Sequence, residues 1–280
     1  MKSKVTDKAG PIGVFASGYG GLTVLSGIKT LLPGYDYIYI GDNARTPYGN
    51  RSFERVYEFT LEAVNWLFSQ GCNLIILACN TASAKALRTI QQKDLPKINA
   101  LKRVLGVIRP TAELAGELTK TGHIGIMGTE GTIQSKSYEL EIGKLYPCMT
   151  VTGEACPMWV PLVENNEYYK PGADYFVKQH IEQLLNKDPL IDSIILGCTH
   201  YPLLLPKINS FLPENIKAID QGRLVAESLA DYLIRHKEID ALCTKNGTVR
   251  YYTTDSPEKF TSQASNFLNE DIVTKLATFN

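Results

Sequence analysis

Short apolar runs alternate with longer amphipathic segments along most of this 280-residue chain, and no other feature constrains its fold as strongly. The apolar runs have the length of buried strands. They predict strands at 11–16, 36–41, 73–78, 103–108, 123–128, 193–197 and 217–220. The amphipathic segments predict helices at 21–32, 53–70, 82–91, 109–120, 173–186 and 223–236. Alternating strands and helices indicate an α/β fold, with helices on both faces of mostly parallel sheets.

The charge balance and the N-terminus limit the class of partner. Lysine and arginine together number 29, as do aspartate and glutamate, so the formal net charge is zero and nothing points to nucleic acid. The longest apolar runs, such as 74–79, are far too short to span a bilayer. No apolar run precedes Pro11, so no secretory signal is predicted. We expect a cytoplasmic protein that binds neither nucleic acid nor membranes.

The chain contains an internal repeat. PIGVFASGYGGLT at 11–23 resembles HIGIMGTEGTIQS at 123–135, and LIILACNTAS at 74–83 resembles SIILGCTHYP at 193–202. Two matches in the same order predict two related, pseudo-symmetric α/β units, although parallel strand–helix units also resemble one another by chance. Since 280 residues exceed the usual size of one domain, two domains are expected. Polar segments interrupted by proline, at 92–103 and 209–220, are the candidate boundaries.

Two of the six cysteines stand out because each ends a predicted buried strand. Cys79 is followed by Asn80 and Thr81, and Cys198 is followed by Thr199 and His200. Ligands of open α/β sheets bind beyond the carboxyl ends of strands, so both cysteines are expected to line crevice loops. Helix starts that follow them are expected to lower their thiol pKa values. The other cysteines are expected to be small buried hydrophobes, and without a C-x-x-C pair no metal site is predicted.

Two thiols on opposite sides of one cleft suit one class of reaction. A thiolate on one face takes a proton from a carbon, and a thiol on the other face returns one, which inverts a stereocentre without a cofactor. His200 could polarise the Cys198 thiol, although an isolated histidine is more often structural. Gly18, Gly20 and Gly21 do not complete a dinucleotide-binding motif and are equally consistent with turns.

Five motifs together resemble the glutamate racemase family. They are ACNTAS around Cys79, GCTHYP around Cys198, GDNARTPYG at 41–49, SGYGGLTVL at 17–25 and CPMWVPLVE at 156–164. The likeness runs in matching order from about residue 11 to residue 236.

This resemblance implies a first α/β domain from residues 1–103 and 221–280, a second from 104–220, and an active site in the cleft between them. It also implies racemisation of L-glutamate to D-glutamate for peptidoglycan, with no pyridoxal phosphate and no metal. A homodimer is left open.

The resemblance also assigns roles to particular residues. Cys79 and Cys198, with His200, are expected to be catalytic. The residues expected to contact the substrate are Ala16, Ser17, Tyr48, Gly49, Asn80, Thr81, Thr199 and His200. Thr129 and Thr132 are further candidates for substrate contacts, and either Glu154 or Glu164 is expected to be an outer carboxylate. Trp159 and Val160 are predicted to lie in the core.

One position departs from the family pattern, and it leaves alternatives open. Ala16 stands where the family has an aspartate that assists the proton transfers of the first cysteine. Alanine can neither carry charge nor move a proton. The chain could therefore be a slow glutamate racemase, a related racemase of aspartate or another amino acid, or a binding protein that has lost activity. Some family members are reported to bind DNA gyrase, so a protein partner is conceivable.

Overall fold

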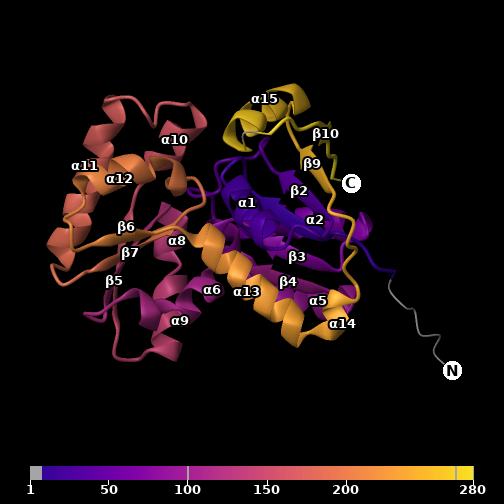
Figure 1. The fold of residues 1–280 in the computed structure, drawn as a ribbon, viewed down its shortest axis with the longest axis horizontal. Helices are drawn as coiled ribbons and strands as arrows, with labels where there is room; N and C mark the ends of the chain where they lie inside the picture. The colour runs from indigo at the N-terminus through magenta and orange to yellow at the C-terminus, as the bar shows by residue number, and fades with distance from the viewer. Residues whose placement is uncertain (1–7, 100, 269, 280) are drawn as a thin grey trace.

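The computed structural model describes residues 8–99, 101–268 and 270–279, which form two parallel sheets with helices on both faces (Figure 1). Residues 1–7, part of the segment in which no secretory signal is predicted, lie outside the described residues. Within the described ranges, no helix is both long and apolar enough to cross a membrane.

Four neighbouring strands of the first sheet have the same order as the four strands of the second sheet. The first sheet runs β10 (Thr274–Leu276), β9 (Val249–Thr253), β2 (Tyr37–Gly41), β1 (Ile12–Ala16), β3 (Leu74–Leu77) and β4 (Arg103–Gly106). The second runs β6 (Thr150–Ala155), β5 (His123–Gly128), β7 (Ser193–Gly197) and β8 (Lys217–Ile219). The order β2-β1-β3-β4 corresponds to β6-β5-β7-β8, and the repeated motifs fall on β1 with β5 and on β3 with β7. The predicted pair of doubly wound parallel-sheet units is therefore confirmed.

Helices connect the strands of each sheet. Those joined to the first sheet are α1 (Gly21–Leu31), α2 (Phe53–Ser69), α3 (Asn80–Lys85), α4 (Leu87–Thr89), α5 (Leu95–Ile98), α14 (Lys237–Asp240) and α15 (Pro257–Leu268). Those around the second sheet are α6 (Ile108–Glu113), α7 (Ala115–Leu118), α8 (Glu130–Gln134), α9 (Ser137–Leu145), α10 (Trp159–Glu164), α11 (Gly172–Lys187) and α12 (Leu205–Phe211). A π-helical turn spans Ile90–Asp94, and a 3₁₀ turn spans Tyr201–Leu204.

Strands β1, β2, β3 and β7 are buried throughout, which is why they appear as continuous apolar runs in the sequence. On one face of the first sheet, Val14 of β1 belongs to a core with side chains of α1. Phe15 belongs to the core on the other face, with residues of α2 such as Val64 and Leu67. This alternation follows from the two-residue period of a strand.

Helix α13 (Gln221–Arg235) follows the second sheet in sequence but packs against α1 of the first (Figure 1). Its buried residues Val225 and Leu229 belong to the same core as Val14. The expected limit at residue 103 is wrong in one respect. It divides β4, whose residues 103–106 pair with β3, so the first unit extends to at least Gly106. The remaining domain limits stay a prediction.

Candidate active site

The two cysteines occupy equivalent places in the two units. Cys79 follows β3 and immediately precedes α3, and Cys198 follows β7. In each sheet the chain moves from the first strand to a neighbour on one side and then crosses to the other side. Each cysteine therefore lies at the point where the strand order reverses, which is where open α/β sheets bind ligands.

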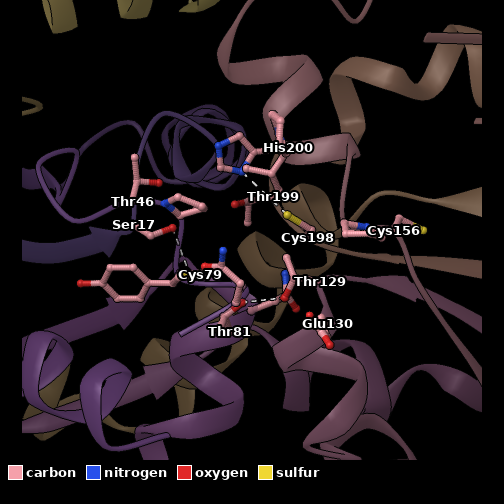
Figure 2. Close-up of a pocket in the computed structure, with 18 residues that line it drawn as sticks. Ser17, Thr46, Cys79, Thr81, Thr129, Glu130, Cys156, Cys198, Thr199 and His200 are labelled. Atoms are coloured by element: carbon pink, nitrogen blue, oxygen red, sulfur yellow. Dashed lines mark hydrogen bonds between the residues drawn. The ribbon is translucent and has the colours of Figure 1, made fainter. Parts of the chain in front are cut away.

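Both cysteines line a single cavity of about 120 Å³ between the two units. Figure 2 shows Ser17 and Cys79 on one side of it and Cys198, Thr199 and His200 on another. Its lining includes ten residues predicted from the sequence: Ser17, Tyr48, Gly49, Cys79, Asn80, Thr81, Thr129, Cys198, Thr199 and His200. Sequence reasoning missed the remaining lining residues, which are Thr46, Pro47, Asn50, Glu130, Cys156, Pro157, Val160 and Pro161.

Two predicted substrate contacts do not line the cavity. Ala16 is only 1% exposed and belongs to the core beneath α1, because the last β1 side chain turns toward that helix. Its methyl group packs so closely on Gly21 that a Cβ there would lie 2.3 Å from it. Thr132 lies behind the wall, where its hydroxyl is 3.1 Å from that of Thr129. The expectation that Ala16 and Thr132 touch a ligand directly is therefore corrected.

The Cys79 thiol is buried and has one polar side-chain partner in the described part of the chain. Its Sγ donates to Ser17 Oγ at 3.6 Å. Burial raises the pKa of this thiol, and hydrogen bonds from the Ala82 backbone and from Ser17 only partly oppose that rise. We expected a lowered pKa from the start of α3, but desolvation is the larger effect here. Without a ligand, Cys79 is therefore a protonated thiol.

Cys198 has an ionisable partner that Cys79 lacks. His200 Nδ1 lies 3.7 Å from Cys198 Sγ, and His200 Nε2 lies 2.6 Å from Glu164 Oε1. Burial alone would lower the pKa of His200, but its hydrogen bonds and charge interactions with Cys198 and Glu164 outweigh burial and raise it to about 10. The ring is an imidazolium at neutral pH that can donate to the sulfur and to the carboxylate together.

The structure separates the two candidate carboxylates. Glu164 contacts His200, whereas Glu154 lies away from the cavity wall and bonds to His180 and Lys187. Glu164 is therefore the outer carboxylate of this site. The glycines of the first unit allow its approach, since a Cβ on Gly20 would lie 2.4 Å from the His200 ring.

Asn80, the residue after Cys79, is held by a buried hydrogen-bond network. Its amide donates to Gln221 Oε1 at 2.8 Å, and its carbonyl accepts from the Tyr138 hydroxyl at 2.6 Å. Gln221 Nε2 in turn donates to Tyr138 at 2.6 Å and to Thr111 at 2.7 Å. The network joins α3, α13, α9 and α6, so both units orient a residue beside the first thiol.

Tyr48 lines the cavity, but its hydroxyl is already engaged. That hydroxyl donates to Asp42, which is fully buried and also accepts from Arg45 Nε at 2.7 Å. Burial, followed by the charge of Asp42, raises the pKa of Tyr48 far above its usual value. The Tyr48 hydroxyl therefore has its hydrogen-bond partner within the first unit.

Hydrogen bonds between the two units close the cavity. Thr81 Oγ1 lies 2.9 Å from Thr129 Oγ1, and the Gly131 N–H donates to Gly49 O at 2.8 Å. Two helix starts, those of α3 and α8, thus meet beside the loop that carries Gly49.

Comparison with known proteins places this architecture in a family. Residues 12–229 match the sequence profile described as Asp/Glu/Hydantoin racemase. The chain belongs to this family. Among its relatives, a glutamate racemase from Ruegeria sp. (strain TM1040) is 38% identical over 276 residues, covering 95% of this chain and 99% of that protein. A glutamate racemase from Streptococcus agalactiae serotype III is 40% identical over 266 residues, covering 94% and 96%.

Solved structures of this racemase family resemble the fold closely. A glutamate racemase isoform from Bacillus anthracis superimposes with a TM-score of 0.87 at 38% identity, covering 97% of this chain and 98% of the other. The glutamate racemase of Francisella tularensis, solved in complex with D-glutamate, superimposes with a TM-score of 0.85 at 32% identity and covers 98% of both chains. The racemase fold therefore extends over nearly the whole chain.

The six cysteines of this racemase-family chain divide by position. Cys72, Cys156 and Cys243 are buried, as predicted, whereas Cys148 is exposed. Cys156 borders the cavity, but in Figure 2 its sulfur points away from Cys198. Among all described residues, no group of three or more histidine, cysteine, aspartate and glutamate side chains is arranged as a metal site.

Proposed function

We propose that this protein is a glutamate racemase that interconverts L-glutamate and D-glutamate through Cys79 and Cys198. The observation that carries the proposal is that two thiols, from equivalent points of two related units, line one cavity. A stereocentre is inverted when a base removes its proton on one face and an acid supplies a proton on the other. Thiols on opposite walls supply both groups.

In each direction one cysteine acts as a thiolate and the other as a thiol. The thiolate takes the α-proton as the C–H electron pair moves onto carbon, and the opposite thiol then delivers its proton to the other face. The sulfur that was a thiolate ends as a thiol, and its partner ends as a thiolate. The reverse reaction restores both, so protons balance over a full cycle.

The two thiols are prepared differently for this exchange. The His200 imidazolium lies next to Cys198, with Nδ1 3.7 Å from its sulfur. Cys79, whose pKa is raised by burial, starts as the acid. The two thiols therefore enter the exchange from different surroundings, with a cation beside Cys198 and a proton on Cys79.

The wider role follows from the reaction. D-glutamate is a component of peptidoglycan, so we assign the protein to cell-wall synthesis in the cytoplasm, without pyridoxal phosphate or a metal. The partner is a small amino acid, and a homodimer is left open. A second candidate function is a catalytically weakened binding protein, because Ala16 stands at the position where the family has a carboxylate.

Isotope exchange tests the proposal directly. The protein is incubated in deuterated water with L-glutamate or with L-aspartate, and deuterium at the α-carbon is followed together with optical rotation. We expect exchange and loss of rotation with glutamate. Faster turnover of aspartate would reassign the substrate, and no exchange with either acid would favour the binding protein.

A further inference from the structure

We infer that Lys85 is a positioning residue that sets the affinity of this site for a dicarboxylic amino acid. It does so by holding the loop 48–51 against α8 and by placing a positive charge behind the cavity wall. The inference rests on the proposed function, because it concerns how the same cavity holds its substrate.

Lys85 lies in an unusual place for a lysine. It ends α3, the helix that starts after Cys79, and is only 8% exposed. Its Nζ donates to Arg51 O at 2.6 Å and lies 5.0 Å from the centre of the Phe53 ring. Burying an ammonium group costs free energy, and burial lowers the pKa of Lys85 despite the opposing charges of two nearby carboxylates.

The Lys85 ammonium reaches the point where the two units meet. A Cβ on Gly131 would lie 2.6 Å from Lys85 Nζ and 2.8 Å from Gly49 O. Gly131 itself donates to Gly49 O across the cleft. Lys85 therefore contacts the loop through Arg51 and the start of α8 through Gly131. Tyr48 and Gly49 on the loop, and Thr129 before α8, all line the cavity.

The residues that line the cavity provide little positive charge. None of its lining residues is a lysine or an arginine, and the His200 imidazolium is engaged by Cys198 and Glu164. Glutamate carries two carboxylates and one ammonium group. A buried cation acts over several ångströms, because the protein interior screens charge less than water does. Lys85 therefore favours a second carboxylate at the Gly49 end of the cavity.

Glu130 carries a negative charge close to Lys85, so its effect on an anionic substrate should be opposite to that of the lysine. Glu130 lines the cavity, and its carboxylate is one of the two that act on Lys85. Its negative charge partly cancels the field of the Lys85 ammonium and repels an anionic substrate. Lys85 and Glu130 should therefore shift the affinity for substrate in opposite directions.

The experiment compares KM and kcat for L-glutamate and D-glutamate in four variants of the full chain. Lys85→Met should raise KM about tenfold or more while kcat changes much less, since no reacting group is altered. Lys85→Arg, which keeps the charge, should stay within about threefold of the parent protein. Glu130→Gln should lower KM.

Lys29→Met is the matched control. Lys29 is also partly buried and paired, with Glu270 at 2.8 Å, but it is not among the cavity residues. Its loss should leave KM unchanged. Thermal unfolding shows which variants are folded, and Glu130→Gln still tests the charge effect if Lys85→Met does not fold.

The outcomes separate this inference from the proposed function. A parent protein that does not racemise glutamate overturns the proposed function. A racemising parent whose KM is the same in Lys85→Met overturns the inference alone. Equal impairment of Lys85→Met and Lys85→Arg, or a raised KM in Glu130→Gln, also overturns it, because packing rather than charge would then be responsible.

Discussion

The Glu164→Gln substitution tests how the second thiol is controlled. His200 is buried, and it keeps its proton because its charge and hydrogen bonds are matched by Cys198 and Glu164. Glutamine preserves the shape and can still accept from Nε2 through its amide oxygen, but it removes the negative charge. The variant therefore isolates the electrostatic part of the contact.

The size of the effect follows from the geometry. The His200 Nε2 to Glu164 Oε1 distance is 2.6 Å, which puts the charge centres at about 4 Å. Two unit charges at that separation interact by about 4 kcal/mol at an effective dielectric constant of 20, or about three pKa units. The pKa of His200 should therefore fall from about 10 toward about 7.

The same shift predicts how stability depends on pH. Because folding raises the pKa of His200 above 6.5, its stabilising contribution is complete below about pH 6.5 and is lost as the pH rises through about 10. In Glu164→Gln most of that contribution is lost already. The difference in thermal stability between parent and variant should be largest near pH 6.5 and shrink toward pH 10.

NMR of labelled histidine measures the shift itself. The chain has four histidines, and a His200→Gln variant assigns the resonance. We expect that resonance to titrate near pH 10 in the parent and about three units lower in Glu164→Gln. The activity of the variant should decline at correspondingly lower pH. A parent His200 that titrates near 6.5, or a variant with the parent's value, would refute this account.

Four further substitutions test other parts of the site. Cys79→Ser and Cys198→Ser should each abolish racemisation, measured by optical rotation, because a hydroxyl is a far weaker acid than a thiol; full activity in either variant would place the chemistry elsewhere. Ala16→Asp should raise turnover, by at most about a hundredfold to ten-thousandfold, and more in the step that uses Cys79; single-turnover isotope washout from each enantiomer measures this, and unchanged rates would contradict it. Tyr138→Phe should cost about 1–3 kcal/mol of unfolding free energy, measured with denaturant, because Asn80 then loses a buried donor; an unchanged value would show that the network does not need it.

The sequence predicted the buried strands better than the edge strands. β1, β3 and β7 are apolar throughout because helices cover both faces, so each appears as a continuous run. β6, β9 and β10 were missed. β6 and β10 lie at edges of their sheets, and their sequences TVTGEA and TKL show no apolar run, since edge strands are partly exposed. β9 lies inside the first sheet, but its sequence VRYYT is only partly buried and carries Arg250.

Sequence motifs predicted the site residues that lie next to one another in the chain. They did not predict the residues that reach the site only through contacts between distant segments. Both cysteines, with the residues that follow them, were found because each ends a strand. Sequence could not choose between Glu154 and Glu164, since only the folded chain brings Glu164 of α10 to His200. Thr46 lies in the motif at 41–49 and Glu130 in the repeat at 123–135, but neither was predicted as a site residue. Spacing in a sequence does not show which residues of a motif border a cavity.

The repeat that builds the cavity supplies both thiols, but their surroundings differ. Equivalent strand ends supply Cys79 and Cys198, so duplication alone gives two similar acids on opposite walls. A racemisation cycle uses one thiolate and one thiol at a time. The two sites nevertheless differ, because His200 and Glu164 place a stable cation beside Cys198, whereas the partners described for Cys79 are the Ser17 hydroxyl and the Ala82 backbone. Ala16 adds no charge on the side of Cys79, so the difference between the two sites depends on His200 and on the pH range in which it remains protonated.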